Sequence, residues 1–166
     1  MKLDELNSTK GTYVGVRFSE KTLDILEQYN KDNGIPNPLK RNKMHATVLY
    51  SRKYCPAYGA PGKYSEPVLA RTDNFEVFTS TSSDGEVSRC LVVKLDCQYL
   101  QLRHSTLMHI HSATYDHPHY TPHITLSYNI GDLDISTLPE LSVDVEIVEE
   151  YGMDLDLDWA KKRGTS

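Results

Sequence analysis

The sequence predicts an α+β fold that forms one domain with two lobes, and three observations lead to this prediction. Short segments that alternate apolar and polar residues, as strands do, are interspersed with two segments of helical periodicity. The order strand–helix–strand occurs twice, on either side of a hairpin signal. No linker separates the two units, and 166 residues is an ordinary length for one domain. We therefore expect a single domain over residues 1–166.

Six segments are predicted to be strands because their apolar residues recur at every second position. In the first, Val14, Val16 and Phe18 share one face. A turn signal, Ser-Asp-Gly at residues 83–85, joins the third and fourth segments into a hairpin. The strands are expected over residues 12–18, 45–51, 75–80, 87–95, 123–128 and 141–151.

Two helices are predicted from helical spacing and from capping residues. The first begins after Ser19, a natural N-cap, and ends at Asn33-Gly34. The second is expected from a cap at Asp96 to about Ala113. Residues 52–70 contain several prolines, glycines and tyrosines, so we expect a loop there, and a mobile cover over a site is one interpretation of it.

The composition predicts a soluble cytoplasmic protein that does not coat long nucleic acid. A formal net charge of −5 lacks the dense basic charge that such binding needs. No apolar segment approaches the roughly 20 residues that span a bilayer, and the first residues show no signal peptide. Three cysteines, an odd number without metal-like spacing, fit a reducing compartment. We expect neither a membrane nor an obligate protein as a partner.

The net charge conceals an uneven distribution. Residues 1–64 contain 11 basic and 6 acidic side chains, whereas residues 132–158 contain 10 acidic and no basic ones. The basic residues on both sides of His45 have two interpretations, attraction of phosphate or a solvated charged surface; they are Lys40, Arg41, Lys43, Arg52 and Lys53. The distribution fits a pocket for one small anion, with acidic side chains that repel long RNA.

Two segments share a longer motif. Residues 45–50 (HATVLY) and 123–128 (HITLSY) both fit H-φ-T-φ-x-Y, in which φ is apolar, and each follows a predicted helix. Because a strand has a period of two, the histidine and threonine of each motif lie on one face and the apolar residues on the other. Two other H-x-T matches, at residues 104–106 and 119–121, lie in a predicted helix or before a proline and lack these flanks.

Two histidines and two hydroxyls that face one cleft suit the cleavage of a phosphodiester bond. With pKa values near 6.5, one imidazole can deprotonate a ribose 2′-hydroxyl while the other protonates the leaving 5′-oxygen. The hydroxyls can donate hydrogen bonds to the non-bridging oxygens as charge builds there. The candidate catalytic residues are His45, Thr47, His123 and Thr125. Which histidine is the base stays open, and two merely structural histidines are the weaker alternative because the flanks repeat as well.

The paired motifs resemble those of the 2H phosphoesterase superfamily, and the resemblance covers about residues 10–151. It implies a pseudo-symmetric two-lobed fold in which antiparallel sheets flank a central cleft, with helices outside, and it carries the same four residues over as catalytic. The segments KGTYVGVRF, KMHATVLYS and TPHITLSY are similar to those of the phage anti-CBASS cyclic-oligonucleotide phosphodiesterases. Those proteins degrade the cyclic di- and trinucleotide messengers by which bacteria trigger abortive infection.

This resemblance implies metal-independent cleavage of 3′–5′ bonds, through a 2′,3′-cyclic phosphate, in the cytosol of an infected bacterium. The implied substrates include cyclic GMP-AMP and cyclic tri-AMP, and no cofactor is implied. The resemblance also implies substrate contacts from Tyr13, Glu150 and Trp159, with Glu149 open as an alternative to Glu150. Aromatic faces stack on bases and carboxylates accept from base edges. A packed strand aromatic, a solvated carboxylate and a side chain docked on the core are the respective structural alternatives.

Two further patterns invite a metal interpretation that we do not favour. Six of the seven histidines lie between His104 and His123, but His109 and His111 are two positions apart on a predicted helix and point in different directions. The acidic run at residues 154–158 lacks the glycine and the spacing of a calcium loop, and is interpreted as an edge strand or a solvated tail. We expect no metal site.

The leading functional hypothesis is therefore a phosphodiesterase for cyclic oligonucleotides. One alternative is another 2H activity, on 2′–5′-linked oligoadenylate, a 2′,3′-cyclic phosphate or an RNA end. The other is a protein that binds the cyclic nucleotide without cutting it, which the two intact histidines disfavour. Base preference, ring size and oligomeric state stay open.

Overall fold

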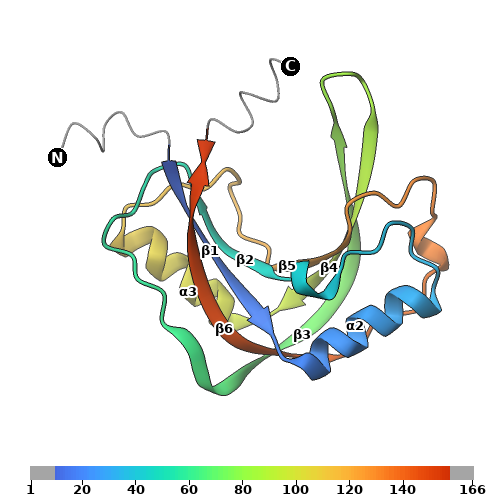
Figure 1. Cartoon of the computed structure of the whole chain (residues 1–166), viewed down its shortest axis with the longest axis horizontal. Coiled ribbons are helices and arrows are strands. Elements are labelled where there is room, and N and C mark those ends of the chain that lie inside the picture. Colours follow the sequence, from blue (N-terminus) through green and yellow to red (C-terminus); the bar gives the residue numbers. More distant parts are fainter. Residues whose placement is uncertain (1–9, 158–166) are drawn as a thin grey trace.

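The computed structural model describes residues 10–157 and consists of a single antiparallel sheet of six strands with two α-helices (Figure 1). The elements in chain order are β1 (Lys10–Phe18), α2 (Glu20–Asp32), η1 (Arg41–Lys43), β2 (Ala46–Ser51), β3 (Gly62–Thr81), β4 (Val87–Asp96), α3 (Gln98–Ile110), β5 (His123–Ser127), η2 (Ile135–Thr137) and β6 (Asp144–Asp156). The α+β class is confirmed. The expectation of more than one sheet is wrong, because all six strands belong to one sheet.

The strand order β2-β1-β6-β3-β4-β5 gives the sheet two similar halves. We call the half made of β2, β1 and β6 the first lobe and the half made of β3, β4 and β5 the second lobe. The long strand β3 pairs with β6 through residues 62–71 and with β4 through residues 71–81, and this makes the two halves continuous. The sheet is strongly curved, so its two edge strands, β2 and β5, approach each other (Figure 1).

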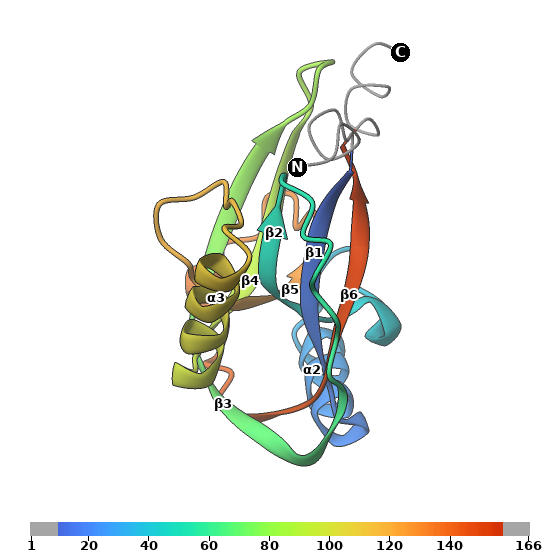
Figure 2. The ribbon, with the colours of Figure 1, turned by 90° about the vertical axis from the view of Figure 1, so that its left-hand side faces the viewer.

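Each helix follows the middle strand of one lobe and makes contacts with the other lobe as well. Helix α2 comes after β1, yet its Tyr29 ring lies 5.6 Å from that of Phe75 in β3, and its Asn30 reaches a carbonyl of β5. Helix α3 comes after β4, yet its Arg103 pairs with Glu150 of β6 in the first lobe. Figure 2 shows both helices outside the curved sheet, with the β3–β4 hairpin extending beyond it. These contacts of each helix with the opposite lobe join the two lobes on their outer faces.

The ends of the helices follow from local sequence. The Ser19 side chain accepts a hydrogen bond from the Thr22 amide (3.2 Å), and α2 ends at the C-cap Asn33, which confirms both predicted caps. Helix α3 begins at Gln98, because the predicted cap, Asp96, is the last residue of β4. No helix within residues 10–157 is long and apolar enough to cross a membrane.

The predicted loop over residues 52–70 is wrong in its second part. Strand β3 already begins at Gly62, and its register shifts between Lys63 and Val68, next to Pro67, which has no amide hydrogen to donate. The first part, residues 52–61, packs against the first lobe: the Cys55 amide donates to Thr12 Oγ1 (2.8 Å). This loop lies against the ends of β1 and β6.

The buried apolar side chains form one cluster that includes both helices. Val16 of β1, Leu26 of α2, Leu100 of α3, Leu126 of β5 and Ile147 of β6 are all completely buried in it. The apolar side of each strand packs into this core, because burying one such side chain contributes about 1.5–3 kcal/mol to the free energy of folding. The concave side of the sheet is left for the polar residues of the two motifs.

Candidate active site

The two histidine motifs lie on the two edge strands. His45 directly precedes β2 and His123 is the first residue of β5. The structure has the predicted alternation: Ala46 and Ile124 are buried, whereas both histidines and the threonines that follow them, Thr47 and Thr125, are half-buried. The curvature of the sheet brings these two edges toward each other.

The two imidazoles are held in the same way. Nδ1 of His45 lies 2.8 Å from the Lys43 carbonyl oxygen, and Nδ1 of His123 lies 2.9 Å from the Thr121 carbonyl oxygen. Because a carbonyl oxygen only accepts, Nδ1 is the protonated nitrogen in each neutral ring. Nε2 is therefore the nitrogen that is available for proton transfer in both motifs.

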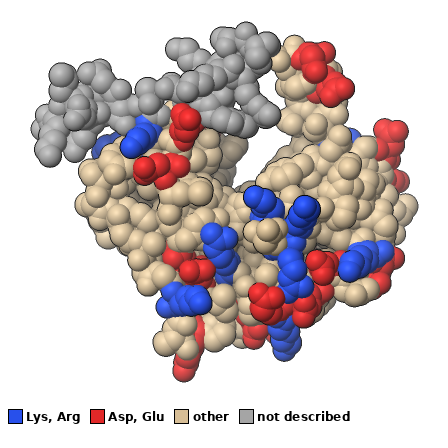
Figure 3. Space-filling model, in the orientation of Figure 1, with Lys and Arg blue, Asp and Glu red and all other residues tan. Residues whose placement is uncertain are grey.

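A cavity of about 630 Å³ lies between the lobes and contains residues of both motifs. Its lining includes Thr47, Tyr50, Glu76, Phe78 and His123, together with the connection from α3 to β5. Figure 3 shows the molecule hollowed between the two lobes, with lysine and arginine side chains gathered beneath the notch.

The two histidines are close enough to interact electrostatically. Burial lowers the pKa of His123 below its ordinary value, and repulsion by a charged His45 lowers it further. The ring of Phe78 contacts His123 edge-on, with 5.3 Å between ring centroids, and contributes to the burial. At neutral pH the His123 imidazole is therefore mainly uncharged and able to accept a proton.

Tyr13 lies between the motif residues of the first lobe. Its hydroxyl is 2.9 Å from Thr47 Oγ1, and its ring meets that of His45 edge-on at 6.0 Å. Burial raises the pKa of Tyr13, so the phenol stays protonated and able to donate to Thr47. Gly15 makes room for it, since a Cβ at this position would lie 2.9 Å from the Tyr13 ring and 2.7 Å from the Tyr151 hydroxyl. Only 8% of Tyr13 is exposed, which leaves little of the ring for stacking on a base.

The structure does not bring Glu150 to the cavity. Glu150 is completely buried on the side of β6 that faces α3, where Arg103 binds both of its oxygens (2.7 and 2.8 Å) and the Tyr58 hydroxyl donates to one of them (2.7 Å). The alternative, Glu149, points to the other side of the strand, next to Arg17 (3.5 Å). The third expected contact, Trp159, lies outside the described residues.

A β-bulge interrupts each motif at the same place. In β2, Gly15 and Val14 pair with Thr47 and Leu49, so that Val48 is an extra residue. In β5, the corresponding shift leaves Leu126 as the extra residue, between Thr125 and Ser127. Each bulge therefore buries two consecutive residues after the threonine. In the first motif it also returns Tyr50 to the face of His45 and Thr47.

The family model of the anti-CBASS protein Acb1 matches residues 10–162. This chain belongs to the Acb1 family. The anti-CBASS resemblance inferred from the sequence is thereby confirmed.

Individual Acb1 proteins are similar over almost their whole length. Anti-CBASS protein Acb1 of Enterobacteria phage T4 is 40% identical over 150 residues, which are 90% of this chain and 91% of that protein. Acb1 of Yersinia phage phiR1-RT is 39% identical over 155 residues, 92% of this chain and 94% of that protein. Among solved structures, TT0787 of Thermus thermophilus is 15% identical with a TM-score of 0.48, over 85% of this chain and 82% of that one.

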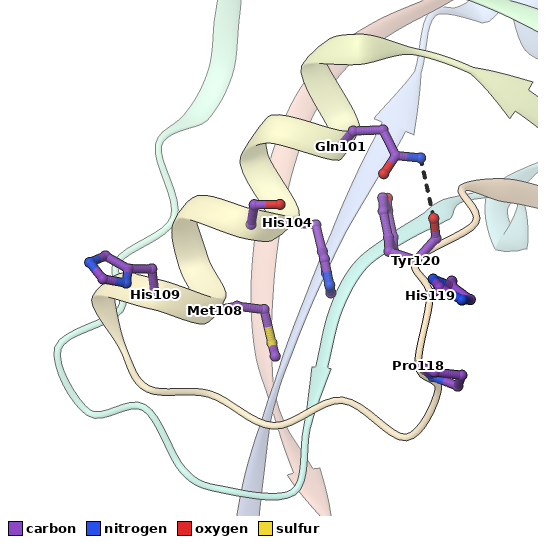
Figure 4. Close-up of a pocket in the computed structure, with 8 residues that line it drawn as sticks. Gln101, His104, Met108, His109, Pro118, His119 and Tyr120 are labelled. Carbon is purple, nitrogen blue, oxygen red and sulfur yellow. Dashed lines mark hydrogen bonds between the residues drawn. The ribbon is translucent and has the colours of Figure 1, made fainter.

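Two residues of this Acb1-family chain that sequence reasoning missed hold the first motif in place. Nδ1 of His104 lies 2.7 Å from the Val48 carbonyl oxygen, and the Tyr120 hydroxyl donates to the Thr47 carbonyl (2.7 Å). The two rings stack at 4.2 Å, and Gln101 donates to the Tyr120 carbonyl (Figure 4). Both residues belong to the H-x-T matches rejected as catalytic, and their helical or loop setting gave no sign of this support.

The basic residues that flank the first motif are largely engaged within the protein. Arg41 forms ion pairs with the first turns of α2, and Arg52 forms one with Asp116. The Lys53 ammonium donates to two backbone carbonyls. On the cavity side of β1, Arg17 instead lies over the Tyr151 ring, 3.9 Å from its centroid. Within residues 10–157, no three His, Cys, Asp or Glu side chains are grouped to hold a metal ion.

Proposed function

We propose that this Acb1-family protein is a metal-independent phosphodiesterase that cleaves the 3′–5′ bonds of cyclic di- and trinucleotide messengers and so counteracts CBASS defence in an infected bacterium. One observation carries the proposal: two imidazoles, each fixed through Nδ1 by a carbonyl two residues upstream, lie near enough to interact, and one of them, His123, lines a cavity together with the motif threonine Thr47. The family supports the biological role, since its members are named anti-CBASS proteins.

The environments of the histidines favour one division of roles. His123 is kept largely neutral by burial, so its Nε2 takes the proton of the ribose 2′-hydroxyl. The 2′-oxygen attacks phosphorus, the bond to the 5′-oxygen breaks, and His45 gives a proton to that oxygen. Water then opens the 2′,3′-cyclic phosphate with the two roles reversed, leaving a linear product with a 3′-phosphate.

The threonines stabilise the charge that builds on the non-bridging oxygens. Because the Tyr13 phenol can donate to Thr47 Oγ1, the Thr47 hydroxyl hydrogen is free to point at phosphate. On the second lobe, burial raises the pKa of the Cys90 thiol and an interaction with Thr125 lowers it, which places the thiol next to Thr125. The cavity, about 630 Å³, has the size of small-ligand sites, which run from about 300 to 1,000 Å³.

Product analysis tests the proposal. The protein is incubated with a panel of cyclic di- and trinucleotides, 2′–5′ oligoadenylate and 2′,3′-cyclic nucleotides, and products are identified by mass spectrometry. We expect linear products with 3′-phosphate ends from cyclic messengers, unchanged by EDTA. His45→Ala and His123→Ala should each lower kcat/KM by about 10²–10⁴-fold. Recovery of every cyclic messenger intact would overturn the proposal, and turnover of 2′–5′ oligoadenylate alone would establish the alternative 2H activity.

A further inference from the structure

Aromatic side chains are exposed on the cavity side of the sheet. Among residues 10–157, three aromatic side chains are markedly exposed: Tyr50 (36%), Phe78 (39%) and Tyr128 (58%). Tyr50 and Phe78 line the cavity. Tyr128 is not among the residues that line the cavity, but it interacts electrostatically with Tyr151, the ring that lies beside Tyr13. Exposed large aromatics that gather at one site indicate a surface that binds something.

The two tyrosines occupy equivalent positions. Each is the last residue of its motif, five residues after the histidine, and an undisturbed strand would turn it to the face opposite the histidine. The bulge at Val48 returns Tyr50 to the histidine face, where it lines the cavity, and Tyr128 directly follows β5 with its matching bulge at Leu126. Bulges that recur at the same point in both halves re-aim a specific side chain rather than merely bend the strand.

The spacing suits a nucleotide. Each tyrosine comes three positions after its threonine, which is about 7–10 Å along a bulged strand. A phosphate held between the histidines and threonines therefore has one tyrosine further out on each side. Tyr50 stays next to the first-lobe site, since its ring is 6.4 Å from that of Tyr13. Phe78 is less suited to stacking because it is engaged edge-on with His123.

We propose that Tyr50 and Tyr128 are a pair of nucleobase platforms, one in each lobe, that stack on two bases of the ring whose phosphate lies between His45 and His123. This inference rests on the proposed function and extends it to how the substrate is held. A tyrosine suits a platform at the rim of a cavity, because its face is apolar and its hydroxyl stays in water. Stacking tolerates every base, so the pair gives affinity with little base selectivity.

Binding is measured without cleavage in the His45→Ala/His123→Ala double variant. The probe is a cyclic dinucleotide with 2-aminopurine in place of adenine, whose fluorescence falls on stacking. In this background, Tyr50→Ala and Tyr128→Ala should each raise Kd by about 5- to 150-fold and reduce the quenching. Tyr50→Phe and Tyr128→Phe should keep Kd within about threefold, because the ring face remains. Tyr54→Ala, in the loop outside the cavity, is the matched control and should leave Kd unchanged.

The outcomes separate this inference from the proposed function. If the wild-type protein cleaves cyclic dinucleotides but both alanine variants bind as the parent does, or the phenylalanine variants are as weak as the alanine variants, the platforms are wrong and the proposed function stands. If the wild-type protein cleaves none of them but binding still depends on both rings, the platforms stand and the proposed function fails. In active protein, the alanine variants should raise KM and change kcat little.

Discussion

In the first lobe, the edge strand with Thr47 is held by two side chains, His104 and Tyr120, whereas the edge strand of the second lobe is held largely by backbone. The Leu126 carbonyl, at the same motif position as Val48, accepts from the Leu39 amide (2.9 Å) and only at 3.4 Å from Asn30. The same motif thus has two different supports. Both motifs contain the bulge, but the carbonyl groups at the bulge accept hydrogen bonds from different kinds of donor in the two lobes.

The supports of the two threonines differ in the same way. The Thr47 hydroxyl is hydrogen-bonded to a phenol, Tyr13, whereas the Thr125 hydroxyl interacts only with a neighbouring thiol, Cys90, which is a weaker hydrogen-bonding group. The first lobe therefore depends on precisely placed aromatic side chains, and the second on the backbone around it. Two nearly equivalent motifs therefore need not be equally tolerant of mutation.

The largest effect is expected where a helix is fixed to the first lobe. Arg103→Ala leaves the buried Glu150 carboxylate without its cation, so we expect a loss of about 3–5 kcal/mol in the free energy of unfolding, measured with urea. The matched control is Arg41→Ala, which removes exposed ion pairs to α2 and should cost far less stability, because solvent screens exposed pairs. Equal losses in the two variants would contradict the structural role of Glu150.

Removing the side-chain donor to the bulge carbonyl should destabilise the protein more in the first lobe than in the second. His104→Phe keeps a ring next to Tyr120 but removes the donor to the Val48 carbonyl, which should cost about 1–3 kcal/mol of stability and lower kcat more than it raises KM. Asn30→Leu should cost less, because the Leu126 carbonyl keeps the Leu39 amide. Urea unfolding and steady-state kinetics measure both variants. A greater loss for Asn30→Leu would reverse the comparison.

A smaller effect is expected when the side chains that contact Thr47 and Thr125 are changed. Tyr13→Phe removes one hydrogen bond to Thr47 and should lower kcat by about 2- to 12-fold, the equivalent of about 0.5–1.5 kcal/mol. Cys90→Ala removes a weak contact to Thr125 and should change kcat by less than about twofold. Steady-state rates on one cyclic dinucleotide decide between these expectations. If Cys90→Ala proved the more damaging of the two, the inferred difference between the supports would be wrong.

The smallest effect concerns pH. Burial lowers the pKa of His104 and of His123 in the folded protein, so the unfolded chain binds protons more readily. Their contribution to stability is complete above about pH 6.5, the unfolded value, and decreases as the pH falls below it. In His104→Gln, an amide that does not titrate replaces one of the two groups, so urea unfolding should depend less steeply on pH between about 6.5 and 5. An unchanged slope would exclude His104 as a contributor.

Much of the fold could be predicted because it is encoded locally. The alternation of β1, the caps of α2 and the hairpin turn each depend on neighbouring residues, and the structure agrees with them. The single sheet was missed because it depends on β3, whose first part, around Pro67, has the composition of a loop. Pairing between distant strands leaves no such local signal.

The candidate site shows the same limit. The motif residues could be found because they repeat, but alternation could not tell which of Glu149 and Glu150 is buried. Ile147 and Glu150 are both buried although they are three positions apart, because the register of β6 against β1 shifts between Phe18 and Arg17. Beyond a bulge, the alternation of buried and exposed residues is reversed. The position of the bulge depends on the pairing with the neighbouring strand, so the local sequence does not reveal it. The support from His104 likewise depends on the packing of α3 against β2.

The most direct test of the central claim, attack by a ribose 2′-hydroxyl between two histidines, compares cyclic GMP-AMP with its analogue that lacks the 2′-hydroxyl beside the scissile phosphate. Binding to the His45→Ala/His123→Ala variant first establishes that both ligands bind. The wild-type protein should then open only the ribose ligand, through a 2′,3′-cyclic phosphate seen by mass spectrometry, and leave the deoxy analogue intact. Cleavage of both at similar rates would contradict the claim, since water or another nucleophile would then attack phosphorus directly.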